Sequence, residues 1–429
     1  MMNRVRPIAS LAAAAALALA LLAGASPAGA LSVPGSTYFP LTPTRLLDTR
    51  VGTGAPVGPL GPGASLDLTV VGVAGVPVTG VTAVVLNVVA TDATAPDSYL
   101  AVYPAGTARP LASNLNVQAG KTGTNLVTIT VPTTGDKAGK VSIYNNLGTV
   151  SVVADISGWY SANGGPVGAT YYPLVPARVL DSRIGVGALR SDILAGQTID
   201  VQVTGVGGVP ATGVSAVVLN VTAVHVAGPE SFLTVFPSGT TRPLASNLNF
   251  LNRRAVPNLV IARIGTNGMV SMYNNLGVMN VVADVQGWYT STGVTSGATY
   301  VPLMPARDLD TRVGTGTGGA VGKMGAGQIL SFAAAGVNGV PAAGVAAVIL
   351  NVTAVDHVGA DSFLTVFPTP AFVDGWHPLA STLNVVHAQT VPNLVVVPVG
   401  PSGRVSVYND AGAVDVVADV QGWFLFSGA

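Results

Sequence analysis

One phrase of charged and apolar residues occurs three times in this chain, and this repetition limits the fold more than any other feature. The phrase is Pro-x-Arg-x-Leu-Asp-Thr/Ser-Arg, and its copies lie 133 and then 129 residues apart, with their shared aspartate at Asp48, Asp181 and Asp310. A second phrase, Ala-Asp-x-x-Gly-Trp-Tyr/Phe, closes each repeat. A unit of about 130 residues can bury a core of its own, so we predict three similar modules and not a solenoid of short repeats.

The N-terminus has the pattern of an export signal. Arg4 and Arg6 precede an apolar run, and Ala28-Gly29-Ala30 is a small-residue cleavage site. Later apolar runs are interrupted within about a dozen residues, short of the ~20 that a membrane helix needs. We therefore predict an extracellular protein without a membrane span after cleavage. The predicted boundaries are 1–30 for the signal peptide and 31–161, 162–290 and 291–429 for the modules.

Strand periodicity dominates inside each repeat. Val214 to Val224 is a nearly continuous β-branched run, typical of a strand covered on both faces. The closing strand around Asp284 alternates, which predicts a sheet with one buried face. Further strands are expected at 198–203, 231–236, 245–250, 258–264 and 270–273. Eight or nine short strands without an amphipathic helix predict an all-β fold of three β-sandwich modules, jelly-roll-like in type. The short joints at 161–168 and 290–297 leave two arrangements open, end to end or around a pseudo-threefold axis.

Charge is scarce and balanced. Charged residues make up 9% of the chain, against roughly 25% in ordinary proteins, and the net charge is zero. This composition argues against nucleic acid and anionic membrane as partners. The absence of cysteine excludes a disulfide framework and a lipid-modified cysteine. A surface so poor in charge favours self-association or adhesion to a neutral partner.

The recurring Arg-x-x-Asp-x-Arg charges permit two interpretations. Arg45 and Arg50 could clamp a carboxylate or sulfate, with Asp48 orienting them. Alternatively, Asp48 pairs with an arginine and Asp155 closes a network that pins the first strand of the module to the last. The structural interpretation is favoured, because alternation along a short strand puts Asp48 and Arg50 on one face. The predicted network comprises Arg45, Asp48, Arg50, Asp155, Arg178, Asp181, Arg183, Asp284, Arg307, Asp310, Arg312 and Asp419.

Aromatic residues offer a second set of candidates. Trp159, Trp288 and Trp423 each follow a glycine at the end of the closing strand. They could stack on sugars, but a ring recurring at a strand end favours packing. Copy 3 also has four extra residues between Pro368 and Pro378. A loop tryptophan is a better contact residue than a core one, so the candidate ligand-binding residues are Phe372, Asp374, Trp376 and His377.

Metal-binding and catalytic patterns are weak. Single carboxylates at Asp97, Glu230 and Asp361 could each hold calcium with nearby carbonyls, although bonding to turn amides accounts for them. We interpret His225 and His357 as one recurring histidine at matched positions; His377 and His387 stand alone. No nucleophile elbow, metalloprotease helix or phosphate loop occurs. We predict no metal, no cofactor and no enzymatic activity.

Several phrases resemble a repeat module of exported actinobacterial proteins. They are Pro-x-Arg-x-Leu-Asp-Thr/Ser-Arg, Leu-Asn-Val-Thr-Ala-Val, Ser-Phe-Leu-Thr-Val-Phe-Pro and Asp-x-x-Gly-Trp-Tyr/Phe. Copy 1 departs with Val88-Val89, and copy 3 has Thr382 in place of Asn114 and Asn247. The resemblance implies a surface or cell-wall role and leaves the ligand open.

Two functions therefore remain. The first is multivalent, non-enzymatic binding or adhesion to an envelope glycan, to peptidoglycan or to copies of the protein itself. The alternative is an extracellular hydrolase acting on cell-wall or other polysaccharide, with Glu230 and Asp361 as candidate carboxylates.

Overall fold

A computed structural model describes residues 35–162, 165–250, 254–370 and 375–426. The predicted signal peptide, 1–30, lies outside these residues. Residues 35–429 cluster as one unit. Within the described ranges, no helix has the length and apolar character needed to cross a bilayer.

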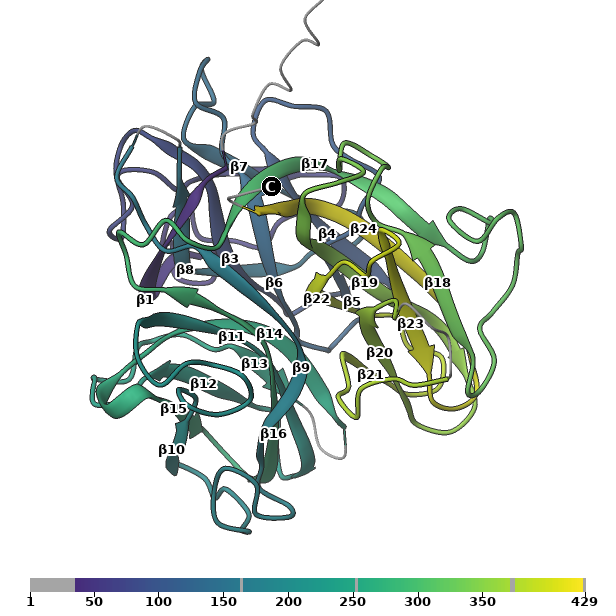
Figure 1. Cartoon of the computed structure of the whole chain (residues 1–429). Coiled ribbons are helices and arrows are strands. Elements are labelled where there is room, and N and C mark those ends of the chain that lie inside the picture. The colour runs from purple at the N-terminus through teal and green to yellow at the C-terminus, as the bar shows by residue number, and fades with distance from the viewer. Residues whose placement is uncertain (1–34, 163–164, 251–253, 371–374, 427–429) are drawn as a thin grey trace, which may run out of the picture. The chain divides into compact units, whose positions relative to one another are not determined.

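The architecture is all-β, as the sequence predicts, and the same set of eight strands occurs three times (Figure 1). The first module contains β1 (Thr37–Asp48), β2 (Ser65–Thr69), β3 (Val81–Thr91), β4 (Ser98–Pro104), β5 (Leu115–Val117), β6 (Gly123–Thr130), β7 (Lys140–Asn145) and β8 (Ser151–Ser161). The second contains β9 (Tyr171–Asp181), β10 (Thr198–Gln202), β11 (Val214–Ala227), β12 (Ser231–Pro237), β13 (Leu248–Phe250), β14 (Val256–Arg263), β15 (Met269–Asn274) and β16 (Val278–Thr290). The third contains β17 (Ala298–Asp310), β18 (Ile329–Ala333), β19 (Val345–Val358), β20 (Ser362–Pro368), β21 (Leu383–Val385), β22 (Val391–Pro398), β23 (Arg404–Asn409) and β24 (Ala413–Phe426).

Each module is a jelly roll. In the first, one sheet has the strand order β1-β8-β3-β6 and the other β2-β7-β4-β5, with every pairing antiparallel. All but one of the connections between consecutive strands therefore cross from one sheet to the other, which is how a jelly roll wraps. The other two modules repeat this order.

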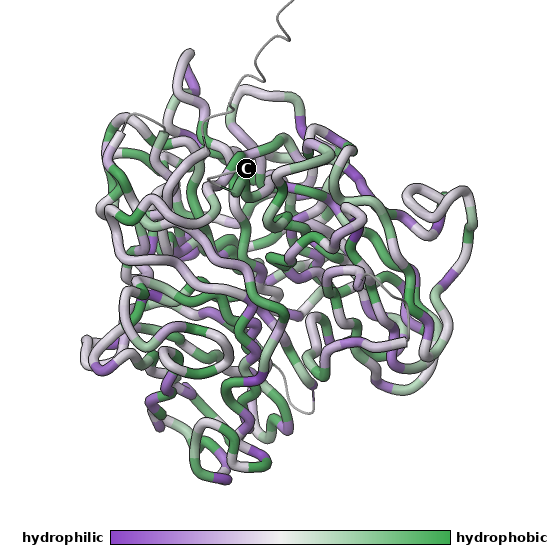
Figure 2. The backbone as a smooth tube through the Cα atoms, in the orientation of Figure 1, coloured by the Kyte–Doolittle hydropathy of each residue, from purple (hydrophilic) through white to green (hydrophobic). Residues whose placement is uncertain are grey.

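Valine, leucine and isoleucine from both sheets form a separate core in each module. Figure 2 shows hydrophilic residues as short segments scattered among hydrophobic and intermediate ones. A sheet rich in β-branched residues packs well on its pleated face, which explains the valine content.

The closing strands β8, β16 and β24 are buried on both faces, so the prediction of one exposed face is wrong there. Every residue of β8 is buried. Val152, Ala154 and Ile156 pack in the module's own core, while Tyr160 packs in a fourth core that joins the modules. The alternation in the sequence was real, but the second face is covered by other modules and not by water.

The starts of the three first strands bond to one another in cyclic order. Ser36 and Tyr300 exchange two backbone hydrogen bonds, of 2.7 and 2.8 Å, and Tyr38 and Ala169 exchange two of 2.8 Å. Tyr171 of β9 pairs with Ala298 of β17 at the third position. The sequence left open an end-to-end and a pseudo-threefold arrangement of the modules. These backbone contacts, in which each module bonds to both others, are those of the pseudo-threefold arrangement.

Six buried aromatic rings form a closed circuit between the modules. The order of contacts is Tyr38, Tyr160, Tyr300, Phe424, Tyr171, Tyr289 and back to Tyr38, with ring centroids 4.4 to 5.6 Å apart. The hydroxyl groups of Tyr160 and Tyr289 are hydrogen-bonded at 2.6 Å. Burial raises the pKa of these tyrosines, so the phenols stay neutral.

Six buried asparagines complete the contacts between modules. Asn258 donates to Asn87 Oδ1 at 2.9 Å, and its own Oδ1 accepts the Leu126 backbone N–H at 3.2 Å. The same two bonds recur around the ring, where Asn393 bonds Asn220 and Leu259, and Asn125 bonds Asn351 and Leu394. Because buried amides need partners, these bonds favour the cyclic arrangement.

Candidate binding clefts between the modules

The predicted charges meet in each module at the junction of the first and last strands. In the second module, Arg178 Nε lies 2.8 Å from Asp284 Oδ1, and Arg178 Nη1 lies 3.2 Å from Asp181 Oδ2. Arg183 donates to both oxygens of Asp181, with Nε at 2.9 Å from Oδ1 and Nη2 at 2.7 Å from Oδ2. The same four positions are joined in the other modules, by Arg45, Asp48, Arg50 and Asp155, and by Arg307, Asp310, Arg312 and Asp419.

The two aspartates of a network differ in pKa. Hydrogen bonds from Arg183 lower the pKa of Asp181, whereas burial raises that of Asp284 despite its bond to Arg178. The same split holds for Asp48 and Asp155, and for Asp310 and Asp419.

The two arginines also differ. The inner one reaches the next module: Arg45 Nη2 donates to the Leu244 carbonyl at 3.2 Å, and Arg178 Nη2 to that of Leu379 at 3.3 Å. The outer side chains of Arg50, Arg183 and Arg312 are 46%, 35% and 44% exposed. Nη1 of each outer arginine makes no hydrogen bond to a described residue, so it is a donor that a ligand could use.

A cleft lies beside these arginines between consecutive modules. The cleft between the first and second modules has a volume of about 360 Å³, and that between the second and third about 240 Å³. The second is lined by Arg178, Arg183, Thr222, Val224, Val282, Phe363, Leu379, Ser381 and Asn384. The first has Arg45, Arg50, Val89, Thr91, Val153, Phe232, Leu244, Ser246 and Asn249 at the matching positions. The cleft is therefore a repeated feature built from two modules.

The lining combines one aromatic ring with amide, hydroxyl and guanidinium groups. Phe232 and Phe363 supply the ring, and Asn249 and Asn384 the amide. Polar and charged side chains make up more than half of each lining, and Glu230 adds a carboxylate to the first cleft, so each wall offers many hydrogen-bonding groups around one aromatic ring. The arrangement suits a polar ring compound carrying a negative substituent.

A cation is stacked on a tyrosine next to the aromatic wall in two modules, and an imidazole in the third. Arg109 lies 3.9 Å from the ring centroid of Tyr144, and Arg242 lies 4.0 Å from that of Tyr273. His377 stacks on Tyr408, with centroids 3.7 Å apart. His377 therefore takes the place of the arginine of the other copies, and each of the three residues directly precedes a proline, at Pro110, Pro243 and Pro378.

The remaining loop candidates are only partly within the described residues. Trp376 is 50% exposed and meets Phe367 edge to face at 6.2 Å. Phe372 and Asp374 lie outside the described residues. Trp376 and His377 are not lining residues of either cleft.

The three recurring tryptophans pack inside their own modules. Trp159 stacks on Phe39 at 4.3 Å, and Trp288 on Tyr172 at 4.6 Å. Trp423 is 4% exposed and pairs with Val301 across the strands. Trp159 and Trp423 are buried, and Trp288 is partly buried against the core of its own module, so the structure agrees with the packing interpretation.

The carboxylates considered for calcium are dispersed. Asp97 Oδ1 accepts a 3.0 Å hydrogen bond from Gln118, Glu230 lines the first cleft, and Asp361 is exposed. No three His, Cys, Asp or Glu side chains gather into a metal-sized group among the residues described.

The prediction that His225 and His357 occupy matched positions is wrong by one residue. Val224 pairs with Asn280, and Val355 with Asp415, so His225 corresponds to Asp356. His225 and Asp356 have positive φ angles, of 51° and 48°, and both side chains are exposed. His357 is fully buried, and its Nε2 lies 3.2 Å from the Ala411 carbonyl. The two histidines were matched only because they are the same residue type. Their burial shows that they occupy different positions, one exposed and one in the core.

Comparisons with known proteins do not assign this chain to a family. No family model matches the chain, and no curated protein matches it. One similar solved structure is a chain from the atomic structure of Sulfolobus Turreted Icosahedral Virus, with 10% identity, 92% of this chain and 91% of that chain covered, and a TM-score of 0.17. Another is a chain from a structure described as the triple jelly roll fold and turret assembly in an archaeal virus, with 9% identity, 90% of each chain covered and a TM-score of 0.16.

Sequence reasoning missed the residues that join the modules. The asparagines at 87, 220 and 351 interrupt apolar β-branched runs in all three copies, and those at 125, 258 and 393 precede a leucine in each. A polar amide recurring inside a buried strand was the signal for a buried hydrogen-bond network.

Proposed function

We propose that this protein is a secreted, non-enzymatic, multivalent binder of an acidic glycan of the cell envelope, held in the clefts between its modules. The observation that carries the proposal is the recurrence of the cleft, with nine matching lining positions at two interfaces. Core packing alone does not explain why both clefts contain an outer arginine whose Nη1 bonds no described residue.

The chemistry of the lining supports a glycan. A sugar ring has an apolar face that Phe232 or Phe363 can cover, and hydroxyl groups that asparagine and serine can bond. A carboxylate on the sugar would accept from Nη1 of Arg50 or Arg183. Weak individual sites gain from repetition, since the second binding event becomes intramolecular.

The hydrolase alternative has less support. Most glycosidases use two carboxylates that flank the scissile bond. Among the residues lining the first cleft, Glu230 is the carboxylate, and none lines the second. The exported location and the envelope as target rest on the N-terminal pattern and on the resemblance of the repeated phrases.

A sedimentation assay with the full chain and purified peptidoglycan, together with a glycan array, tests the proposal. We expect binding that weakens at least tenfold in the double variant Phe232→Leu/Phe363→Leu, with unchanged thermal unfolding. Val57→Ala, at an exposed position outside both clefts, is the matched control. Equal binding by the double variant, or release of soluble sugar from the same material, would overturn the proposal.

A further inference from the structure

A pocket lies where the three modules meet, and each module contributes the same part of its chain to it. We call it the central pocket; it has a volume of about 90 Å³. The first module contributes residues 115–118 and 121–124, the second Asn249, Arg254, Val256 and Pro257, and the third residues 389–392. Three matched positions line it in every module: Lys121, Arg254 and Gln389; Gly123, Val256 and Val391; Thr124, Pro257 and Pro392.

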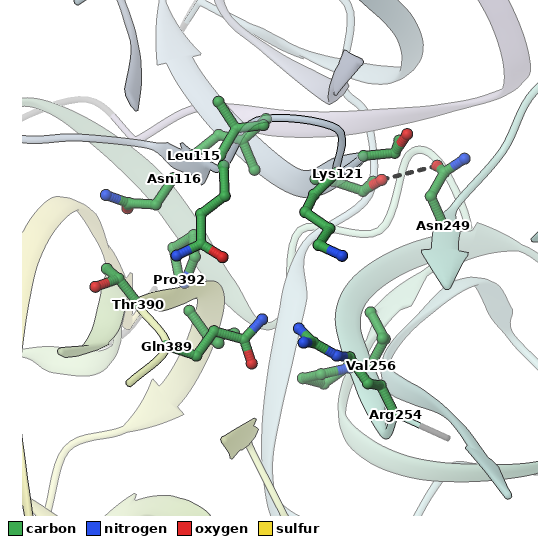
Figure 3. A pocket seen from close by; sticks show the side chains of 16 residues that line it. Leu115, Asn116, Lys121, Asn249, Arg254, Val256, Gln389, Thr390 and Pro392 are labelled. Atoms are coloured by element: carbon green, nitrogen blue, oxygen red, sulfur yellow. Dashed lines mark hydrogen bonds between the residues drawn. The ribbon is translucent and has the colours of Figure 1, made fainter. Parts of the chain in front are cut away.

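Two cations face this pocket, and neither has a partner among the described residues. Lys121 and Arg254 each lie four residues after the last residue of their short strand, as does Gln389. Figure 3 shows the three side chains extending toward one another from different modules. Neither Lys121 nor Arg254 has an ion pair or side-chain hydrogen bond with a described residue, and no acidic residue lines the pocket. Two like charges in one recess repel each other, and an anion between them removes this cost.

The other lining groups are suited to an anion. Gln118, Gln389 and Thr390 add neutral side chains that can donate hydrogen bonds. Two acids, Asp97 and Asp356, line the neighbouring recess; Asp97 accepts from Gln118 at 3.0 Å, and Asp356 pairs with Lys323 at 3.0 Å. The volume accommodates several water molecules or one small ion.

We propose that the central pocket binds a phosphate group. Viewed along one P–O bond, a tetrahedral oxyanion presents three oxygens related by a threefold axis. This matches three donor side chains at pseudo-threefold positions, whereas a planar carboxylate presents only two oxygens. Arginine and lysine are the standard phosphate partners in proteins. The site is separate from the aromatic walls of the clefts and does not depend on glycan binding there.

Isothermal titration of the full chain with inorganic phosphate, against acetate at the same ionic strength, tests this proposal. We expect phosphate to bind more tightly than acetate. Lys121→Gln and Arg254→Gln should each weaken phosphate binding about tenfold, since each removes one charge-assisted contact. Gln389→Lys should strengthen it by a similar factor by adding a third cation. Arg190→Gln, at an exposed arginine outside the pocket, is the control and should change nothing.

A second titration with glycerol phosphate identifies the source of the group. Equal or tighter binding of the ester points to phosphate carried on a larger molecule, and binding of the free ion alone points to inorganic phosphate. The proposal is overturned if phosphate binds no better than acetate, or if the Lys121→Gln/Arg254→Gln double variant binds phosphate as the parent chain does. Phe232→Leu/Phe363→Leu should retain phosphate binding, which separates this result from a failure of the glycan proposal.

Discussion

The charges of each module perform different tasks according to how deeply they are buried. The inner arginine and the aspartate of the last strand hold the sheet together and touch the next module, while the outer arginine keeps one edge of its guanidinium exposed. The ion pairs agree with the structural interpretation of the repeated phrase for the inner arginine, and our proposal limits the ligand-clamp interpretation to the outer one. Spacing along the sequence could not separate them, because burial decides which donor remains available.

Replacing Asp181 tests the structural part. In the full chain, Asp181→Asn weakens two ion pairs of a side chain that is 1% exposed. We expect the free energy of unfolding to fall by about 3 kcal/mol at pH 7, because Arg183 loses its charge partner and Arg178 keeps only Asp284. Urea denaturation measures this. Asp136→Asn, at an exposed loop position, should leave the unfolding midpoint unchanged, and a similar midpoint for both variants would contradict a structural role.

The buried carboxyl of Asp308 should make the free energy of unfolding fall as the pH rises. Copies 1 and 2 have Leu46 and Val179 at this position, but copy 3 buries a carboxyl that is 5% exposed and bonded to Asn338 at 2.7 Å. Burial raises the pKa of Asp308 to about 7. Between pH ~4 and 7 the native state therefore holds a proton that the unfolded state has lost, so its contribution to stability is lost as pH rises.

The variant Asp308→Val removes this dependence. The shift corresponds to about 4 kcal/mol, from about 1.4 kcal/mol for each pKa unit. We expect Asp308→Val to be more stable than the parent chain by up to that amount at pH 8, and to differ much less at pH 4. Thermal or urea unfolding at the two pH values provides the comparison, and a gap that does not change with pH would refute the assignment.

The strands show what their amino-acid pattern could and could not predict. Valine-rich runs such as Val214–Ala227 were recognisable, since a continuous β-branched segment of this length is typical of a covered strand. The closing strands were misjudged in one respect: Asp284 was expected to pair with an arginine, as it does, but its face of the sheet was not expected to be buried as well. Alternation of residue types shows that the two faces of a strand differ in composition, but it does not show which face, if any, is exposed to solvent.

The glycine before each recurring tryptophan has a specific reason at the level of the strand. The phenol ring of Tyr171 lies directly against Gly287, and a Cβ there would overlap it. Gly158 meets Tyr38 and Gly422 meets Tyr300 in the same way. In each Gly-Trp pair, the tryptophan packs in the core of the module. The glycine before it leaves room for a tyrosine ring of the aromatic circuit to pack against the strand.

Gly287→Ala should therefore be costly. We expect the free energy of unfolding to fall by about 3 kcal/mol, because an extra methyl in a close-packed site forces the ring or the strand to move. Urea denaturation and the near-ultraviolet circular dichroism of the tyrosines report the change. Gly61→Ala, where a Cβ meets nothing within 4 Å, serves as the control. Equal stability of the two variants would show that the ring can shift freely.

At the scale of the molecule, the three modules form one compact unit, in which contacts between modules close a ring. The sequence indicated three modules but left their arrangement open, since joints of about eight residues suit a row as well as a ring. The deciding residues are asparagines and tyrosines that bond between copies. A single sequence does not reveal which buried polar group has its partner in another module, although it shows that the group recurs.

Asn258 allows the ring to be tested at one side chain. Its amide donates to Asn87 and to the Asn247 carbonyl, and its oxygen accepts the Leu126 N–H, so it links the first and second modules. Asn258→Ala leaves Asn87 Oδ1 and the Leu126 N–H buried without partners. Each orphaned group costs about 1–3 kcal/mol, so we expect a total loss of about 3 kcal/mol or more.

The control for this variant is Asn146→Ala, whose side chain accepts only a 3.4 Å bond from Tyr144 of its own module. If contacts between modules stabilise the whole chain, Asn258→Ala shifts a single cooperative urea transition that tryptophan fluorescence from all three modules follows together. If the modules were energetically independent, the transition would instead split, with the third module unfolding at the unchanged midpoint. The first outcome requires the ring to be a property of the molecule in solution, because no bond made by the Asn258 side chain reaches the third module.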